Sequence, residues 1–277
     1  MTNLIGIYGV RAADFGRWAS LGIDAVIGHE KDGLMPDRAT RVDYCAAAQA
    51  NGLAAYISPS DKPSVDVTLP AFAGWVQPDE ADGRVSPTAY RDAYFKLKGR
   101  GYPVLGNFAA HQLIDGVIDV KTYKIYFEGC DVWGFDWYIA NRNKTLSVGL
   151  ETQRRIIDGV RGLVGRARPW IETIESGLHL AGGRVPTVED VRAQMLLARD
   201  EGAAGIVFFS LREPHHPGGF SWDTTPPEVR EALPQLIEEF RLGPEGIRLR
   251  ARVATLEAAA TSASDILTSA LEETSDS

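Results

Sequence analysis

The sequence predicts an α/β fold of the (β/α)₈ TIM barrel class, followed by a C-terminal helix with a heptad pattern. Two observations predict the barrel: short apolar runs alternate strictly with longer helical patterns, and eight such units fit within 277 residues. Strict alternation implies parallel strands joined by crossover helices, and single barrels of this kind run to about 250 residues. An open doubly wound sheet is the competing fold. Its glycine-rich phosphate fingerprint is absent after the first strand, where the chain reads Gly6-Ile7-Tyr8-Gly9-Val10-Arg11.

The expected elements follow from apolar runs and from helix start signals. Ser86-Pro87 provides an N-cap followed by proline at the first helical position. Thr187 with Asp190 resembles a capping box. No helix is predicted over 61–68. The strands are expected at 4–10, 23–28, 53–58, 72–76, 103–108, 132–138, 169–174 and 204–210, and the helices at 13–21, 38–50, 86–98, 112–127, 146–164, from 187 onward and 227–240.

The C-terminal region has a different pattern from the barrel. The expected organisation is a barrel over 1–242, a linker over 243–248, a helix over 249–271 and an acidic tail over 272–277 that frays. Apolar residues in the helix follow one another at alternating spacings of four and three, which is the seam of a heptad repeat. They are Leu249, Val253, Leu256, Ala260, Ala263, Leu267 and Ala270. Either this helix mediates oligomerisation or anchoring, or it packs back on the barrel.

The net charge and the distribution of apolar residues limit which molecules the protein is expected to bind and where it is expected to be made. The net charge is −8, which disfavours nucleic acid because phosphate binding needs a basic surface. A neutral polymer such as an oligo- or polysaccharide fits better. The N-terminus lacks the basic region of a signal peptide, so synthesis in the cytoplasm is expected. No run of about 18 apolar residues predicts a membrane span.

No metal or cofactor is predicted. Cys45 and Cys130 lie in no metal-type or redox-type spacing and are expected to be small buried residues. His215 and His216 are adjacent in a loop of glycine and proline, without nearby cysteine or paired carboxylates. Such a pair is more typical of a plain loop than of a metal site.

The stretch Gly74–Asp82, G-W-V-Q-P-D-E-A-D, is the most informative for function. An apolar approach ends abruptly in carboxylates, and the C-terminal end of a barrel strand is where catalytic side chains are displayed. A solvated acidic loop is the alternative. Glu80 follows the fourth strand and Glu175 ends the seventh, so they are expected on opposite sides of the barrel mouth. Two carboxyls facing each other there suit glycoside cleavage, with one as acid and the other as nucleophile or base.

Four further residues near strand ends are candidates for sugar contacts. Asn107, Asp136 and Tyr138 carry groups that hydrogen-bond hydroxyls, and Trp137 offers an aromatic face for stacking on a sugar ring. Rim residues serve packing as well as function, and large aromatic residues dominate cores. A structural role is therefore the alternative for each.

Several segments resemble one known group of proteins. G-W-V-Q-P-D-E-A-D is similar to the G-W-x-x-x-D-E-P-D motif of clan A-type barrel glycoside hydrolases, which carry the acid/base on strand four and the nucleophile on strand seven. R-P-W-I-E-T-I-E-S-G (168–177) resembles their seventh-strand segment, D-V-W-G-F-D-W-Y (131–138) their sixth, and 185–210 their last helix and strand. Such domains occur in minor tail and other virion proteins of actinobacteriophages. The resemblance spans about residues 4–240 and excludes the C-terminal helix.

The resemblance implies that Glu80 is the acid/base and Glu175 the nucleophile of a retaining mechanism. Glu172 is the rival nucleophile, and strand alternation puts Glu172 and Glu175 on opposite faces. Two departures stand out. Ala81 replaces the usual proline, and Asp79 stands where many members have an asparagine that binds the sugar 2-hydroxyl. Asp79 is therefore expected to contact the sugar differently.

The expected function is a retaining glycoside hydrolase that acts on a cell-surface glycan as a virion component, located on the phage particle or outside the cell. The alternative is a catalytically inactive barrel that serves as a structural or glycan-binding virion protein, assembled as a homo-oligomer or into the virion through the C-terminal helix. An aldolase-like barrel is weaker, because no lysine lies at a predicted strand end and no glycine-rich phosphate loop follows strand seven or eight.

Overall fold

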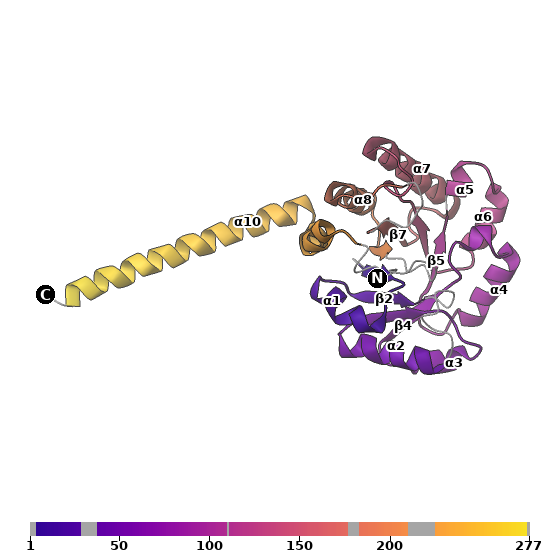
Figure 1. Ribbon diagram of the computed structural model, residues 1–277, viewed down its shortest axis with the longest axis horizontal. Coiled ribbons are helices and arrows are strands. Elements are labelled where there is room, and N and C mark those ends of the chain that lie inside the picture. Colours follow the sequence, from indigo (N-terminus) through magenta and orange to yellow (C-terminus); the bar gives the residue numbers. More distant parts are fainter. Residues whose placement is uncertain (1–3, 29–37, 110, 177–182, 210–224, 276–277) are drawn as a thin grey trace. The chain divides into compact units, whose positions relative to one another are not determined.

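The chain forms a closed barrel of eight parallel strands in the order β1 to β8, with β8 pairing back to β1 (Figure 1). The computed structural model describes residues 4–28, 38–109, 111–176, 183–209 and 225–275. Helices surround the strands, as crossover connections between parallel strands require. The predicted (β/α)₈ barrel is confirmed.

The strands coincide with the predicted apolar runs to within a few residues. They are β1 Leu4–Tyr8, β2 Ala25–Gly28, β3 Ala54–Ile57, β4 Phe72–Val76, β5 Val104–Phe108, β6 Val132–Asp136, β7 Trp170–Glu175 and β8 Gly205–Phe209. The helices are η1 Ala12–Asp14, α1 Phe15–Ser20, α2 Arg38–Ala50, α3 Pro63–Asp66, η3 Ala81–Gly83, α4 Pro87–Leu97, α5 His111–Ile114, α6 Val120–Phe127, α7 Leu146–Val164, α8 Val188–Asp200 and α10 Pro227–Ser275.

Two helical segments differ from expectation. A short helix, α3, follows the third strand, where none was predicted; proline at its first turn suits a helix start. The helix predicted over 112–127 is two helices, because Gly116 adopts a φ of 70° and breaks the path. Asp119 then caps α6 by accepting hydrogen bonds from the backbone N–H groups of Lys121 and Thr122.

Side chains fill the barrel interior, which is a packed core and not a pore. Its buried members come from every strand or its C-terminal end: Leu4, Tyr8, Ala25, Ile27, Tyr56, Val76, Leu105, Val132, Tyr138, Ile171, Val207 and Phe209. Alternate residues of a strand share a face. Asn107 and Thr173 lie two residues after Leu105 and Ile171, and Asp136 lies four residues after Val132. All three therefore point to the same interior, one layer or more closer to the C-terminal mouth.

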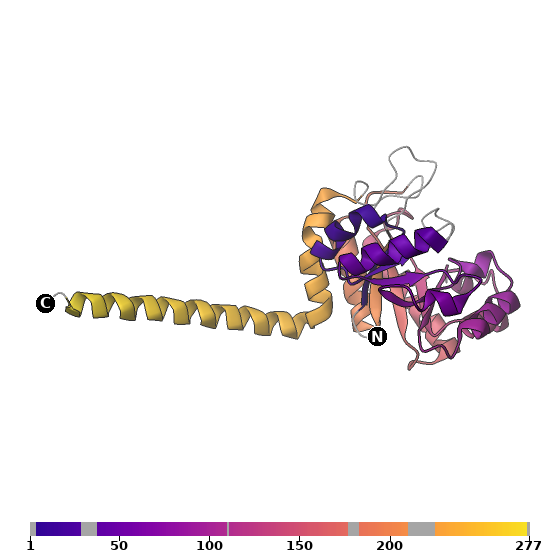
Figure 2. The same cartoon turned by 90° about the horizontal axis from the view of Figure 1, so that it is seen from below.

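The C-terminal region is a second compact unit, Glu238–Ser277, distinct from Met1–Ile237. The predicted linker over 243–248 is helical except for a kink at Gly243, whose φ of 67° is open to glycine. After the kink the helix is continuous to Ser275, so the described part of the predicted frayed tail is helical (Figure 2).

None of the helices in the described ranges is long and apolar enough to cross a membrane.

Closure of the barrel between β8 and β1 generates a stability prediction. A Cβ added at Gly205 would lie 2.4 Å from the Leu4 carbonyl oxygen and 2.7 Å from its Cβ. Backbone atoms of a paired strand cannot move aside, so Gly205→Ala should lower the free energy of unfolding by about 1–3 kcal/mol. Urea unfolding monitored by circular dichroism measures this change in the free energy of unfolding.

Gly162→Ala is the matched control. Gly162 lies in α7 with nothing within 4 Å of an added Cβ. The same chemical change there should raise the free energy of unfolding by about 0.5–1 kcal/mol, because alanine restricts the unfolded chain and favours helix. Equal effects at both positions would contradict the close approach at Gly205.

Candidate active site

Five polar side chains converge at the C-terminal mouth of the barrel from four strands. Asp79 and Glu80 follow β4, Asn107 belongs to β5, Asp136 ends β6 and Thr173 lies in β7. Asp79, Glu80 and Asn107 are partly exposed, whereas Asp136 and Thr173 are buried. The cluster therefore extends from solvent into the barrel.

Glu80 has a backbone conformation that residues other than glycine seldom adopt. Its φ of 43° and ψ of 46° are left-handed, which normally favours glycine. The turn that follows holds it there, because Gly83 N–H donates to the Glu80 carbonyl at 3.1 Å. The Glu80 carboxylate forms an ion pair with Arg84, and its side chain stays 26 % exposed. Glu80 is thus open to a ligand at the mouth.

Asp136 is the most perturbed carboxyl at the mouth. It is 3 % exposed. Burial raises its pKa well above the usual range, and the negative charges of Glu80 and Asp79 raise it further. Burial and the neighbouring negative charges therefore both favour the protonated form of Asp136.

Asp79 is oriented by a short hydrogen-bond chain across the mouth. Asn107 Nδ2 donates to Asp79 Oδ1 at 2.9 Å. Thr173 Oγ1 in turn donates to Asn107 Oδ1 at 3.3 Å. These two hydrogen bonds fix which side of the Asn107 amide faces Asp79, and they link the C-terminal ends of β4, β5 and β7.

The third carboxylate of the acidic stretch has a structural role. Asp82 is 3 % exposed and accepts hydrogen bonds from the Ala109 backbone N–H and the Tyr123 hydroxyl. Burial raises its pKa, and these hydrogen bonds oppose that shift. Asp82 thereby ties the loop after β4 to the end of β5 and to α6.

Tyr138 and Trp137, the aromatic candidates, are both largely covered. Tyr138 is 6 % exposed and stacks on Phe209 with ring centroids 5.3 Å apart. Trp137 is also 6 % exposed; its indole N–H donates to the Gly149 carbonyl, and the Arg142 guanidinium lies 4.9 Å from the ring centroid. Sugar stacking on Trp137 stays a prediction, and little of its ring is accessible.

Glu175 is fully buried and held by four donors. The backbone N–H groups of Ala140 and Asn141 donate at 2.6 and 2.8 Å, the Asn141 amide at 2.7 Å and the Gln194 amide at 3.3 Å. Burial raises its pKa, and these bonds oppose the shift. Its partners belong to the loop before α7 and to α8, whereas the Glu80 carboxylate pairs with Arg84. The two glutamates predicted to act together thus have separate surroundings.

Glu172 lies on the other face of β7. It is fully buried, accepts a hydrogen bond from the Gln153 amide of α7 at 2.6 Å, and burial raises its pKa well above the usual range. Glu172 therefore packs between the barrel and the helices, where burial favours its neutral form. The expected opposite orientation of Glu172 and Glu175 matches these contacts.

Thr173 and Arg84 were missed at the sequence level. The alternation in I-E-T-I-E around Thr173 puts it on the face of Ile171, which is a signal that could have found it. Arg84 follows Glu80 by four residues, a spacing that predicts an ion pair only where the chain is helical, and the sequence predicted no helical turn there.

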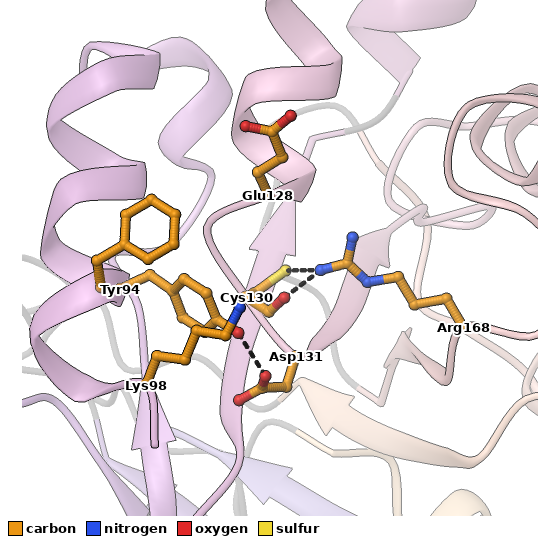
Figure 3. A pocket seen from close by; sticks show the side chains of 7 residues that line it. Tyr94, Lys98, Glu128, Cys130, Asp131 and Arg168 are labelled. Carbon is orange, nitrogen blue, oxygen red and sulfur yellow. Dashed lines mark hydrogen bonds between the residues drawn. The ribbon is translucent and has the colours of Figure 1, made fainter. Parts of the chain in front are cut away.

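A cavity of about 390 Å³ lies at the opposite end of the barrel from these residues, before β6 and β7 (Figure 3). Its groups satisfy one another: the Tyr94 hydroxyl donates to Asp131 at 2.6 Å, and Arg168 donates to the Cys130 carbonyl and sulfur. Burial raises the pKa of the Cys130 thiol to about 12, so it is no nucleophile at neutral pH. This end of a barrel typically serves stability.

In the described parts of the chain, no three histidine, cysteine, aspartate or glutamate side chains are arranged to hold a metal ion. His215 and His216 lie outside those parts.

Known structures share the fold of this chain. An active-site mutant of the β-1,3-glucanosyltransferase from Rhizomucor miehei superposes with a TM-score of 0.57 at 14 % identity, covering 82 % of this chain and 96 % of that one. The endo-β-1,4-mannanase from Thermotoga petrophila gives 0.59 at 10 % identity, with 88 % and 78 % covered. A truncated 3-deoxy-D-arabino-heptulosonate 7-phosphate synthase from Thermotoga maritima gives 0.50 at 14 %, with 87 % and 85 % covered.

No profile of a known protein family matches the chain, and no curated protein is similar to it in sequence. The structural likeness therefore establishes the barrel, which glycosidases share with enzymes of other classes.

The raised pKa of Asp136 generates a pH prediction. Its pKa is raised in the folded state, so its contribution to stability is full below the unfolded pKa and is lost as pH rises towards the folded one. Asn is close in size to Asp and cannot ionise. Asp136→Asn should therefore gain stability relative to wild type as pH rises from 4 to 8, by at most about 1.4 kcal/mol per unit.

Urea unfolding at several pH values measures this difference. Asp92→Asn, at an exposed position of α4, is the control for removing a carboxylate. Parallel curves for wild type and Asp136→Asn across this pH range would refute the buried proton.

Four donors around Glu175 generate a second prediction. Glu175→Gln replaces one acceptor oxygen by an NH₂ group that faces N–H donors, so the free energy of unfolding should fall by about 1–3 kcal/mol. Glu151→Gln, exposed on α7, should change it by less than about 0.5 kcal/mol. An unchanged midpoint of urea unfolding for Glu175→Gln would show that the four bonds contribute nothing.

Proposed function

We propose that this protein is a glycoside hydrolase that acts on a cell-surface glycan, and that the carboxyl pair Glu80–Asp136 supplies its acid. The observation that carries the proposal is the buried carboxyl of Asp136 beside the partly exposed Glu80 and Asp79 at the barrel mouth. The glycan as substrate class is supported by the glucanosyltransferase and the mannanase among the structural neighbours.

The proton transfer follows from the exposure of the two groups. Glu80 is the partly exposed member, so the glycosidic oxygen approaches Glu80. Asp136 is buried, and burial and the charge of Glu80 raise its pKa, so in this proposal Asp136 returns a proton to Glu80. Protonation of the glycosidic oxygen lets the sugar leave as an alcohol, because a neutral leaving group departs more easily than an alkoxide.

Asp79 is the second carboxylate in this proposal. It is partly exposed at the same rim, and Asn107 orients it. Asp79 stabilises positive charge on the sugar ring and takes the proton of the water that adds to the anomeric carbon. The bond from carbon to the leaving oxygen breaks and the bond from carbon to water forms, so one water is consumed per linkage.

The retaining mechanism with Glu80 and Glu175 is the competing version. It needs two carboxyls about 5–5.5 Å apart with a nucleophile free to attack. The four hydrogen bonds on Glu175 favour a positioning role instead, in which it holds the loop before α7.

Release of reducing sugar from actinobacterial envelope polysaccharide, β-glucan and mannan tests the proposal. Glu80→Gln and Asp79→Asn should each lower kcat at least about a hundredfold, with the fold intact by circular dichroism. Glu151→Gln is the matched control. Loss of kcat in Glu175→Gln at unchanged stability, with activity retained in Asp79→Asn, would instead establish the two-glutamate mechanism.

A non-catalytic virion protein that binds glycan or builds the particle is the second candidate. The exposed apolar residues Leu249, Val253 and Leu256 favour it, because they lie in a unit separate from the barrel. Absence of hydrolysis across the glycan panel, together with glycan binding that Asp79→Asn weakens, would establish this function over the first.

A further inference from the structure

The helix after Gly243 presents a row of large apolar side chains to solvent. Leu249, Val253 and Leu256 are 55 %, 50 % and 68 % exposed. They follow one another at spacings of four and three, so they lie along one stripe of the helix. A continuous exposed aliphatic stripe is typical of a surface that binds a partner.

The residue types within the stripe indicate what that partner is. In heptad notation Leu249 and Leu256 occupy d positions and Val253 the a position between them. A β-branched residue at a with leucine at d favours two parallel strands. The same spacing continues in the sequence through Ala260, Ala263, Leu267 and Ala270.

The charges beside the stripe are complementary between two identical helices. Arg252 is the g position before Val253, and Glu257 is the e position after Leu256. Both are exposed. In a parallel pair in register, the g residue of one helix faces the e residue of the next heptad on the other. Arg252 of each copy then faces Glu257 of the other, twice per dimer, whereas an antiparallel pair would bring like charges together.

We infer that the helix after Gly243 binds the same helix of a second copy of this chain, in parallel and in register. Arg250, the preceding e residue, already contacts Glu238 of its own chain and is not needed for the argument. The inference is independent of the activity proposed for the barrel, because the helix belongs to a separate compact unit.

Light scattering of the full chain after size-exclusion chromatography tests the association. The expected mass is twice the 30.2 kDa of one chain. Arg252→Glu should raise the dissociation constant about tenfold, Glu257→Arg should do the same, and the double variant should restore wild-type affinity. Arg248→Glu is the matched control, since Arg248 occupies a c position away from the stripe.

A cysteine pair tests the direction of the helices. Val253→Cys brings two thiols together across a parallel pair in register, so mild oxidation should yield a covalent dimer. Ala251→Cys, at the f position, should yield little. The native Cys45 and Cys130 are buried, which keeps them out of the reaction. A mass of one chain at every concentration, a charge reversal without effect, or equal cross-linking at 251 and 253 would each overturn the inference.

Discussion

Closure of a parallel sheet into a barrel aims alternate side chains of every strand at one axis, and the chemistry of this protein depends on that constraint. Apolar residues occupy the lower layers of the interior, and Asn107, Asp136 and Thr173 occupy the layers at the mouth. Their neighbours in sequence face the helices instead. A shift by one residue in any strand would exchange the two sets.

Burial and hydrogen-bond partners give different environments to three carboxyl groups that look equivalent in the sequence. Asp136, Glu172 and Glu175 are all taken from water, and burial raises the pKa of each. Their partners differ: Asp136 meets another carboxyl, Glu172 a single amide, and Glu175 four N–H donors. Hydrogen bonds tie Glu172 and Glu175 to neighbouring elements, whereas Asp136 lies beside the negative charges of Glu80 and Asp79. This contrast is why the proposed function uses carboxyls of β4 and β6 and not of β4 and β7.

The two ends of the barrel also differ in how fully their polar groups are paired. At the N-terminal end, the polar groups around Cys130 and Asp131 satisfy one another. At the C-terminal end, one oxygen of Asp136 has no hydrogen-bond partner although it is buried. A buried polar atom without a partner destabilises the folded state, and such costs are common at functional sites. The association inferred for the helix after Gly243 involves a separate compact unit, so assembly and any activity at the mouth would change separately.

The local pattern of the sequence by itself determined the barrel, since alternating apolar runs and capped helices need only neighbours along the chain. The same pattern pointed to Glu80 and Asp79, because strand ends are readable from it, and to the stripe from Leu249 to Leu256. It could not reveal the break at Gly116, which depends on φ, nor the orientation of Glu175, whose donors come from Ala140, Asn141 and Gln194. The tertiary structure alone decided that the pKa of Asp136 is raised, because burial and the approach of Asp79 and Glu80 from another strand set that pKa.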